Sequence, residues 1–154
     1  NYISRQISRW TKQYRASETE KIESMENLMN WLPENIPDDE MVSIVHGDFR
    51  MDNLVFNKAG TEILAVLDWE LSTLGHPLAD FAYHCMYWRL TAQEFRGIKG
   101  EDLVSLGIPF ENNYVDMYCK SIGINYINNW GNENHSLLWG LPTIHLYKIY
   151  VCQS

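Results

Sequence analysis

Apolar residues recur at helical spacing along the first part of the chain. Side chains three or four positions apart share one face of a helix, so this spacing predicts two helices, over residues 3–14 and 17–32. Ser17 and Glu20 stand three positions apart and predict a capping box at the start of the second helix. The apolar positions that define the two faces are Ile3, Ile7, Trp10 and Tyr14, followed by Ile22, Met25, Leu28, Met29 and Leu32.

Two further helices are predicted after residue 76. Pro77 suits the first turn of a helix through residues 78–90, because the first turn leaves its N–H groups without partners in any case. Residues 110–122 carry an amphipathic pattern, and Gly123 is suited to end that helix because glycine accepts the left-handed conformation of a C-terminal cap.

Three short runs rich in branched apolar residues predict β-strands, at 41–46, 53–57 and 62–68. The segment 58–60 joins the second run to the third and predicts a hairpin. The segment 71–77 is predicted to be a loop. The fold class that follows is α+β, mostly helical with a small β-hairpin insert.

The composition narrows the classes of partner. The chain has 154 residues, of which 45% are hydrophobic, so it can bury the core of one domain. Its net charge is −8 and the sequence contains no run of Lys and Arg, which argues against nucleic acid or an anionic membrane as a partner. Cys85, Cys119 and Cys152 are far apart and odd in number, which favours a reducing, cytoplasmic location. No apolar run approaches the roughly twenty residues of a membrane span.

The residues suited to chemistry concentrate in the stretch IVHGDFRMDNLVF, residues 44–56. His46, Asp48 and Asn53 have the spacing of a kinase catalytic loop, in which the aspartate accepts the proton of the attacking hydroxyl and the asparagine binds a metal ion. Asp68 ends the third strand run, and the hairpin would bring it back beside Asn53. There it would be a second ligand of Mg²⁺, which takes one or two carboxylates together with phosphate oxygens and water.

Other polar residues near this loop have a functional and a structural interpretation. Arg50 is predicted to lie near the transferred phosphoryl group, where its charge would offset charge developing on the oxygens. His46 is interpreted as a structural residue that fixes the loop, and Asp52 as solvated or capping the turn. Asp80 either benefits from the dipole of a first helical turn or braces the catalytic loop through backbone hydrogen bonds. Glu70 could reach a second metal ion or the substrate, or lie on the surface.

The stretches VHGDFRMDNLVF and AVLDWELSTLGHPLADFAY resemble the aminoglycoside phosphotransferase and choline kinase superfamily. They are most similar to the kinase-like domain fused to acyl-CoA dehydrogenases and to its bacterial relatives, and the resemblance extends over residues 1–130. It implies that residues 1–154 are the C-terminal lobe of a protein-kinase-like fold, in which the hairpin insert carries the catalytic loop. Residues 131–154 are expected to be an altered or truncated end.

The resemblance also implies an activity, the ATP-dependent phosphorylation of a small-molecule hydroxyl. For the fused subgroup the implied acceptor is a hydroxyacyl-CoA. Asp48 would be the catalytic base, Asn53 and Asp68 would hold Mg²⁺ beside the phosphates of ATP, and Asp80 would brace the loop.

The sequence departs from the kinase pattern in three ways. Gly47 replaces the arginine that in protein kinases pairs with a phosphorylated activation loop, and His76 stands where many relatives have aspartate. In addition, no Gly-rich loop or ATP-positioning lysine precedes the catalytic loop. The expectation is therefore an incomplete fragment, inactive by itself, that self-associates through the face a nucleotide lobe would cover.

Two other functions compete with the kinase hypothesis. A non-catalytic binding or scaffold module would keep the fold, but it has no need of Asp48, Asn53 and Asp68 together. A metal-dependent phosphoesterase could use His46, Asp48 and Asp68. That class usually needs further histidines in metal-binding motifs, and His84, His135 and His145 show no ligand spacing.

Overall fold

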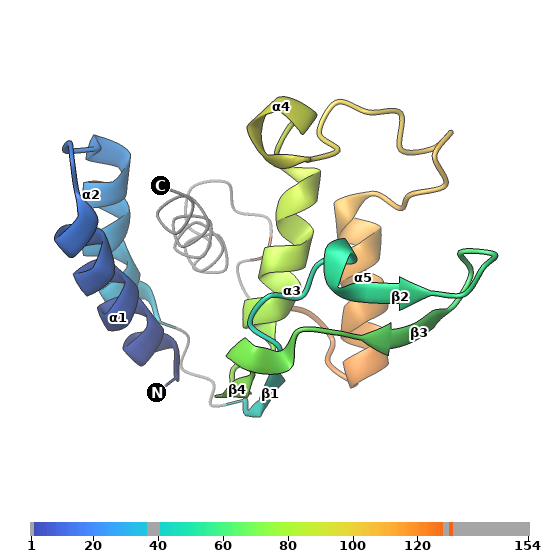
Figure 1. The fold of residues 1–154 in the computed structure, drawn as a ribbon, viewed down its shortest axis with the longest axis horizontal. Coiled ribbons are helices and arrows are strands. Elements are labelled where there is room, and N and C mark those ends of the chain that lie inside the picture. The colour runs from blue at the N-terminus through green and yellow to red at the C-terminus, as the bar shows by residue number, and fades with distance from the viewer. Residues whose placement is uncertain (1, 37–40, 128–129, 131–154) are drawn as a thin grey trace. The chain divides into compact units, whose positions relative to one another are not determined.

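The protein mixes helices with short strands, and Figure 1 shows their order along the chain. This computed structural model describes residues 2–36, 41–127 and 130. The described residues divide into two compact units, one up to residue 84 and the other from residue 85 onward. Among the described helices, none is long and apolar enough to cross a membrane. The altered end predicted from residue 131 onward lies outside the described residues.

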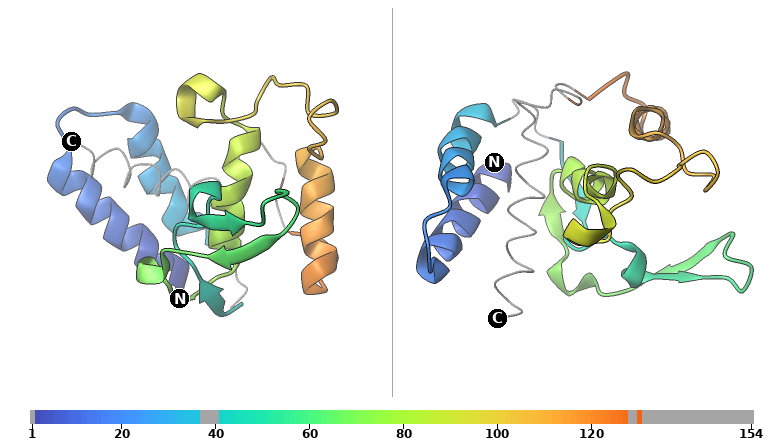
Figure 2. Two further views of the ribbon diagram at one scale, coloured as in Figure 1. Left: turned by 45° about the vertical axis from the view of Figure 1, so that its right-hand side comes forward. Right: turned by 90° about the horizontal axis from the view of Figure 1, so that it is seen from above.

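Helices α1 (Tyr2–Ser17) and α2 (Glu23–Trp31) lie side by side, as Figures 1 and 2 show. A 3₁₀ turn, η1 (Leu32–Asn35), follows α2 and contributes to their common core. Arg15 of α1 donates from Nη2 to Glu26 Oε2 of α2 at 2.7 Å, which links the outer edges of the pair. The apolar spacing thus predicted that two helices form here, although not where the second begins, and their buried core consists of Ile3, Ile7 and Leu32.

The capping box predicted at Ser17 and Glu20 is wrong. Ser17 still belongs to α1, and its Oγ donates back to the Gln13 carbonyl at 2.9 Å. Helix α2 begins later than the pattern predicts, with Ile22 at its N-cap and no side-chain cap. A serine at the end of a helix can donate its hydroxyl to a carbonyl of the last turn. This local hydrogen bond forms in place of the predicted cap of α2.

The described chain has a capping box at the short helix α4 (Ala92–Phe95). Thr91 Oγ1 accepts from the backbone N–H of Glu94 at 3.3 Å, while Glu94 Oε2 accepts from the backbone N–H of Thr91 at 2.8 Å. Two N–H groups that a helix start leaves unpaired are thereby satisfied. Arg96, with φ of 48°, ends this helix in the left-handed conformation.

In the described residues, four short strands form two antiparallel pairs. Strand β1 (Ser43–Val45) pairs with β4 (Thr73–Gly75), and β2 (Leu54–Phe56) pairs with β3 (Ile63–Val66). The prediction that residues 71–77 form only a loop is wrong, because they contain β4. This strand is three residues long and exists through pairing with β1, a segment far back in the sequence, which no local pattern reveals.

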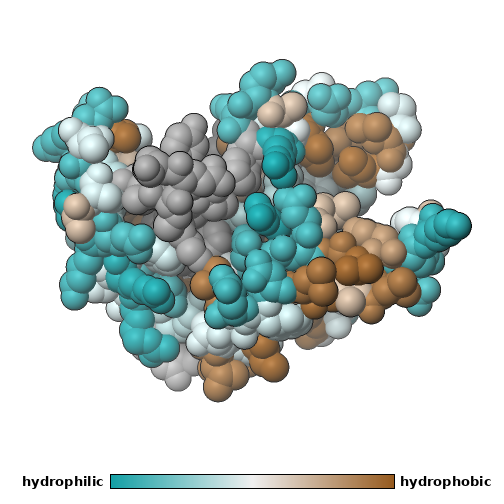
Figure 3. All heavy atoms as spheres, in the orientation of Figure 1, coloured by the Kyte–Doolittle hydropathy of each residue, from teal (hydrophilic) through white to brown (hydrophobic). Residues whose placement is uncertain are grey.

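The β2–β3 hairpin exposes much apolar surface, which is visible as brown spheres over these strands in Figure 3. Ile63 and Leu64 are 50% and 61% exposed, and Val55 and Phe56 are also exposed. The hairpin therefore contributes little to the core. Its contribution to the site is that it brings the segment after β3 back beside Asn53.

Helix α3 (Leu78–Cys85) follows Pro77 directly, as predicted, but it is shorter than the predicted 78–90. The chain tightens into a 3₁₀ turn, η4 (Met86–Trp88), which Arg89 closes by donating its N–H to the Met86 carbonyl at 3.0 Å. The buried residues of α3 are Leu78, Phe81, Ala82, Tyr83 and Cys85.

The second unit is built around α5 (Glu111–Ile122). Arg89 Nε donates to both carboxylate oxygens of Glu111 at 3.1 Å, and the ring of Trp88 stacks on that of Tyr114 with centroids 4.9 Å apart. Gly123, with φ of 76°, ends α5 in the left-handed conformation, so the predicted end of this helix is confirmed.

Candidate active site

The carboxylate of Asp80, on α3, anchors the start of the loop between β1 and β2. Asp80 Oδ2 accepts the backbone N–H of His46 at 2.5 Å, and Asp80 Oδ1 accepts that of Gly47 at 2.9 Å. Hydrogen bonds from backbone N–H groups to an ionised carboxylate are among the stronger ones in proteins. Asp80 therefore fixes the direction in which the chain leaves β1, immediately before Asp48.

The imidazole of His46 ties the same loop to the end of the hairpin. The backbone N–H of Asp48 donates to His46 Nδ1 at 3.2 Å, so the ring proton resides on Nε2, which donates to the Leu67 carbonyl at 2.8 Å. The ring is only 3% exposed and packs against Trp69 at a centroid distance of 4.7 Å. Both nitrogens are engaged by the backbone, which leaves neither of them to bind a metal ion.

Gly47 occupies a position that no residue with a side chain fits. Its φ is +85°, and a Cβ built on it would lie 2.8 Å from the Leu71 carbonyl oxygen. The backbone of the loop after β1 and the segment after β3 are thus in direct contact. The arginine of protein kinases could not stand here without moving Leu71.

We expect Gly47→Ala to destabilise the chain more than a glycine substitution at a site with open space. Gly60 has φ of +70° and no atom within 4 Å of the place that a Cβ would take, so Gly60→Ala carries the conformational strain of about 1–2 kcal/mol without a clash. Overlap with the Leu71 backbone should add about 1–3 kcal/mol to the loss for Gly47→Ala. Urea unfolding of both variants measures the difference, and equal losses would show that the contact with Leu71 yields freely.

Asn53 joins the site from the first turn after the loop, where it is 8% exposed. Its Nδ2 donates to the Asp48 carbonyl at 2.9 Å and approaches Asp48 Oδ2 at 3.3 Å. The amide is thereby oriented, with its nitrogen toward Asp48, and Oδ1 is the atom that remains for a metal ion. The spacing of five positions between the two residues is what allows this contact.

Asp68 lies next to Asn53 through the pairing of the hairpin. The backbone N–H of Leu67 donates to the Asn53 carbonyl at 2.8 Å. Asp68 directly follows Leu67, so its backbone begins beside that of Asn53. Its backbone is left-handed, with φ of 63° and ψ of 53°, and its side chain is exposed. A residue with a side chain in this conformation is strained unless its surroundings hold it, and such strain gathers at functional sites.

The donors of Asn53 and Asp68 fit Mg²⁺ bound together with phosphates. Both offer oxygen atoms, which hard cations prefer, and Mg²⁺ usually takes one or two protein carboxylates and completes its shell with phosphate oxygens and water. Within residues 2–36, 41–127 and 130, no three His, Cys, Asp or Glu side chains gather into a metal site of their own. An ion at this place would therefore depend on a bound phosphate group.

Arg50 places a positive charge at the edge of Asp48. Its Nε lies 3.4 Å from Asp48 Oδ2, and its Nη1 lies 3.7 Å from the exposed Asp52 Oδ2. The Nε atom is buried and has no hydrogen-bond acceptor in the described part of the chain. A buried guanidinium N–H without an acceptor suits an incoming anion such as a phosphoryl group.

Other residues singled out in the sequence lie apart from this group. Glu70 is exposed and faces the pocket on the α1 side of the loop. His76 is buried, and its Nδ1 accepts the Leu78 N–H at 3.3 Å, so it shapes the start of α3. The ring of His84 contacts that of Phe49 with centroids 5.9 Å apart, and burial lowers the pKa of the His84 imidazole.

Comparison with known proteins agrees with this geometry. Residues 1–109, more than half of the chain, match the family described as "Phosphotransferase enzyme family". The chain belongs to this family. The resemblance stated from the two sequence stretches is therefore confirmed, and the mixed helix and strand fold is that of a phosphotransferase-family domain.

Several named proteins are similar to most of this chain. It is 51% identical over 132 residues to acyl-CoA dehydrogenase family member 10 of Mus musculus, and 43% identical over 133 residues to acyl-CoA dehydrogenase family member 11 of Homo sapiens. These matches cover 84% of this chain but only 12% and 17% of those proteins.

A solved structure is similar as well. A crystal structure from Ralstonia eutropha, described as an aminoglycoside phosphotransferase, matches with a TM-score of 0.89 and 47% sequence identity. The match covers 98% of this chain and 45% of that one. The chain therefore corresponds to a part of each of these longer proteins.

Proposed function

We propose that this chain carries the catalytic loop of an ATP- and Mg²⁺-dependent kinase that phosphorylates the hydroxyl group of a small molecule. The observation that carries the proposal is the arrangement around Asp48. Its carboxylate lies between the amide of Asn53 and the guanidinium of Arg50, and Asp68 follows the strand that pairs beside Asn53. Membership of the phosphotransferase family gives this arrangement its chemical context.

Each residue has a distinct role in the proposed reaction. Asp48 would accept the proton of the acceptor hydroxyl as that oxygen attacks the phosphoryl group. Arg50 would stabilise negative charge on the transferred group through its buried Nε. Asn53 Oδ1 and Asp68 would hold Mg²⁺, which, when bound, neutralises charge on the phosphates of the nucleotide. Positioning of Asp48 would depend on Asp80 and His46.

We infer a hydroxyacyl-CoA as the acceptor. Support comes from the mouse and human relatives, which are named as acyl-CoA dehydrogenase family members and which exceed this chain several-fold in length. The protein of the Ralstonia eutropha structure is named for a different acceptor, an aminoglycoside. A panel of hydroxyacyl-CoAs, choline and aminoglycosides, tested with the full-length natural protein for ATP consumption, distinguishes them. We expect consumption with a hydroxyacyl-CoA, and activity with aminoglycosides alone would contradict the inferred acceptor.

The two competing functions are less well supported by the site. A phosphoesterase centred on His46 and Asp68 would need an imidazole nitrogen for its metal ion, and both nitrogens of His46 are bonded to the backbone. A non-catalytic module would not require Asn53 to be turned toward Asp48. Measurable Mg²⁺-dependent binding of ATP without transfer to any acceptor would favour the binding module.

A further inference from the structure

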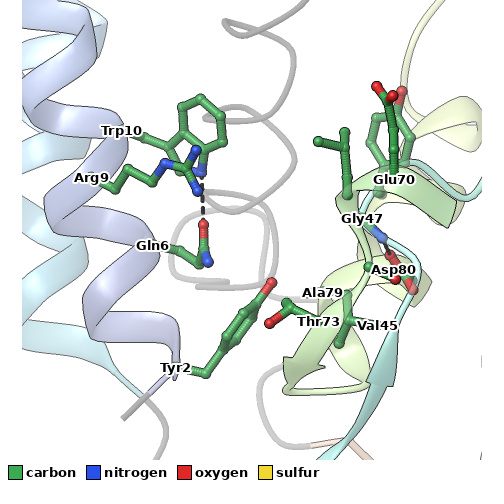
Figure 4. Close-up of a pocket in the computed structure, with 13 residues that line it drawn as sticks. Tyr2, Gln6, Arg9, Trp10, Val45, Gly47, Glu70, Thr73, Ala79 and Asp80 are labelled. Carbon is green, nitrogen blue, oxygen red and sulfur yellow. Dashed lines mark hydrogen bonds between the residues drawn. The ribbon is translucent and has the colours of Figure 1, made fainter.

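A pocket of about 400 Å³ lies on the other side of the catalytic loop, between α1 and the β1–β4 pair with the start of α3. Figure 4 shows its two walls. Tyr2, Gln6, Arg9 and Trp10 project from α1, and Gly47 of the catalytic loop lies on the opposite wall. Asp48 follows Gly47 directly, so this pocket lies one residue along the chain from the proposed catalytic base.

The exposed face of α1 is strongly basic although the protein has a net charge of −8. Arg5, Arg9 and Lys12 stand four and three positions apart, so the helix brings them onto one face, where they line a groove with the hydroxyl groups of Ser4 and Ser8. The sequence has no run of basic residues, but the helical spacing of these three places them together on one face. No acidic residue occurs within α1.

Within the described residues, the charges on this face have no carboxylate partners. Arg15, at the end of the same helix, is paired with Glu18 and Glu26. In the part of the chain that the structure describes, Arg5, Arg9 and Lys12 take part in no ion pair. Neighbouring like charges repel one another, so three unpaired cations on one face are expected to attract an anion.

Arg9 connects the basic groove to the pocket, since it lines both. Its guanidinium lies over the ring of Trp10, 5.3 Å from the centroid, and Trp10 Nε1 donates to Gln6 Oε1 at 3.1 Å. The guanidinium is thus supported at the pocket wall. The pKa of the Tyr2 hydroxyl is raised, mainly by burial and next by the Asp80 charge, while Arg5 and Arg9 act in the lowering direction. The carboxylates of Glu70 and Asp80 line the loop side of the pocket, and the guanidinium of Arg9 lines the α1 side.

We propose that the basic face of α1, centred on Arg9 with Arg5 and Lys12, binds an anionic group of the acceptor, while the uncharged part of the acceptor lies in the pocket beside Gly47. This inference rests on the proposed kinase function and deepens it by naming the substrate class, an alcohol that carries phosphate or carboxylate groups. The geometry selects against polycationic acceptors. Their amino groups would be repelled by Arg9 at the pocket wall and by Arg5 and Lys12 in the adjoining groove.

The test uses one hydroxyacyl group in three forms, presented to the full-length natural protein. These are its CoA thioester, its pantetheine thioester without the CoA phosphates, and the free hydroxy acid. We expect Arg9→Gln to raise KM for the CoA thioester on the order of tenfold while leaving kcat near normal. The pantetheine thioester should show no such change, and Arg9→Lys, which keeps the charge, should restore much of the affinity. Arg15→Gln is the matched control, because Arg15 is an exposed cation of the same helix with carboxylate partners of its own.

Equilibrium dialysis of CoA against wild type and Arg9→Gln, with excess ADP to fill the nucleotide site, separates the two proposals. If Arg9→Gln loses CoA binding while the wild type phosphorylates no acceptor, the anion site is supported and the kinase proposal is wrong. Phosphorylation with Arg9→Gln behaving like Arg15→Gln would sustain the kinase and overturn the anion site. A shift in KM for the free acid alone would assign the anion to a carboxylate, and equal losses for all three forms would overturn recognition of charge.

Discussion

Asp48→Asn is expected to lower turnover of the full-length natural protein by about 10²–10⁴-fold. The amide has the shape of the carboxylate but cannot accept the proton of the attacking hydroxyl. Asn53 Nδ2 can still approach the oxygen of the new side chain, so the loop should keep its conformation. Affinity for Mg²⁺ and nucleotide should change little, because the proposed ligands are Asn53 and Asp68. Steady-state turnover together with nucleotide binding measures both effects.

Asp52→Asn provides the matched control for this substitution. Asp52 belongs to the same loop and also lies near Arg50, at 3.7 Å, but its side chain is 54% exposed. It should retain most of the wild-type turnover. Near-normal turnover of Asp48→Asn would remove Asp48 from the role of base, whereas equal losses in both variants would point to the charge around Arg50 as the quantity that matters.

Asp68→Ala is expected to abolish Mg²⁺-dependent binding of ATP. Mg²⁺ at this site has few protein ligands, so removal of the carboxylate takes away the only charged one among them in the proposed set. Asp68 has a left-handed backbone, and alanine there adds conformational strain. Asp68→Asn therefore serves as a second variant, since asparagine accepts this conformation and lacks the charge.

Calorimetry of ATP binding with and without Mg²⁺ reports the result. Glu62→Ala is the matched control, because Glu62 is an exposed acid immediately before β3. It should bind Mg·ATP like the wild type. Unchanged Mg·ATP affinity in both Asp68 variants would mean that the proximity of Asp68 to Asn53 has no part in metal binding.

The elements that the sequence predicts well are those defined by local periodicity. Helices α1 and α5 follow from apolar spacing, and the end of α5 follows from the conformational freedom of Gly123. Strand β4 could not be predicted in this way, because it is formed by pairing with β1 and not by a pattern of its own. The start of α2 was misplaced because Ser17 bonds to a carbonyl of α1 instead of capping the next helix.

In the candidate site, too, contacts within a short segment could be predicted and contacts between distant segments could not. The contact between Asp48 and Asn53 arises within a loop, so their spacing carried the information. The contact of the His46 ring with the Leu67 carbonyl spans 21 positions and involves a backbone atom, which sequence does not mark. Arg9 was missed because exposed cations at helical spacing are ordinary on a surface helix, and only the pocket beside the loop distinguishes this one.

The central claim is that the protein transfers a phosphoryl group to an alcohol, and the product itself tests this most directly. The full-length natural protein would be incubated with Mg²⁺, γ-labelled ATP and a hydroxyacyl-CoA, and the acceptor would be isolated and analysed by mass spectrometry and ³¹P NMR. We predict a labelled phosphate ester at the hydroxyl carbon, absent without Mg²⁺ and nearly absent with Asp48→Asn. Tight, Mg²⁺-dependent binding of ATP with no phosphate ester on any acceptor of the panel would contradict the account.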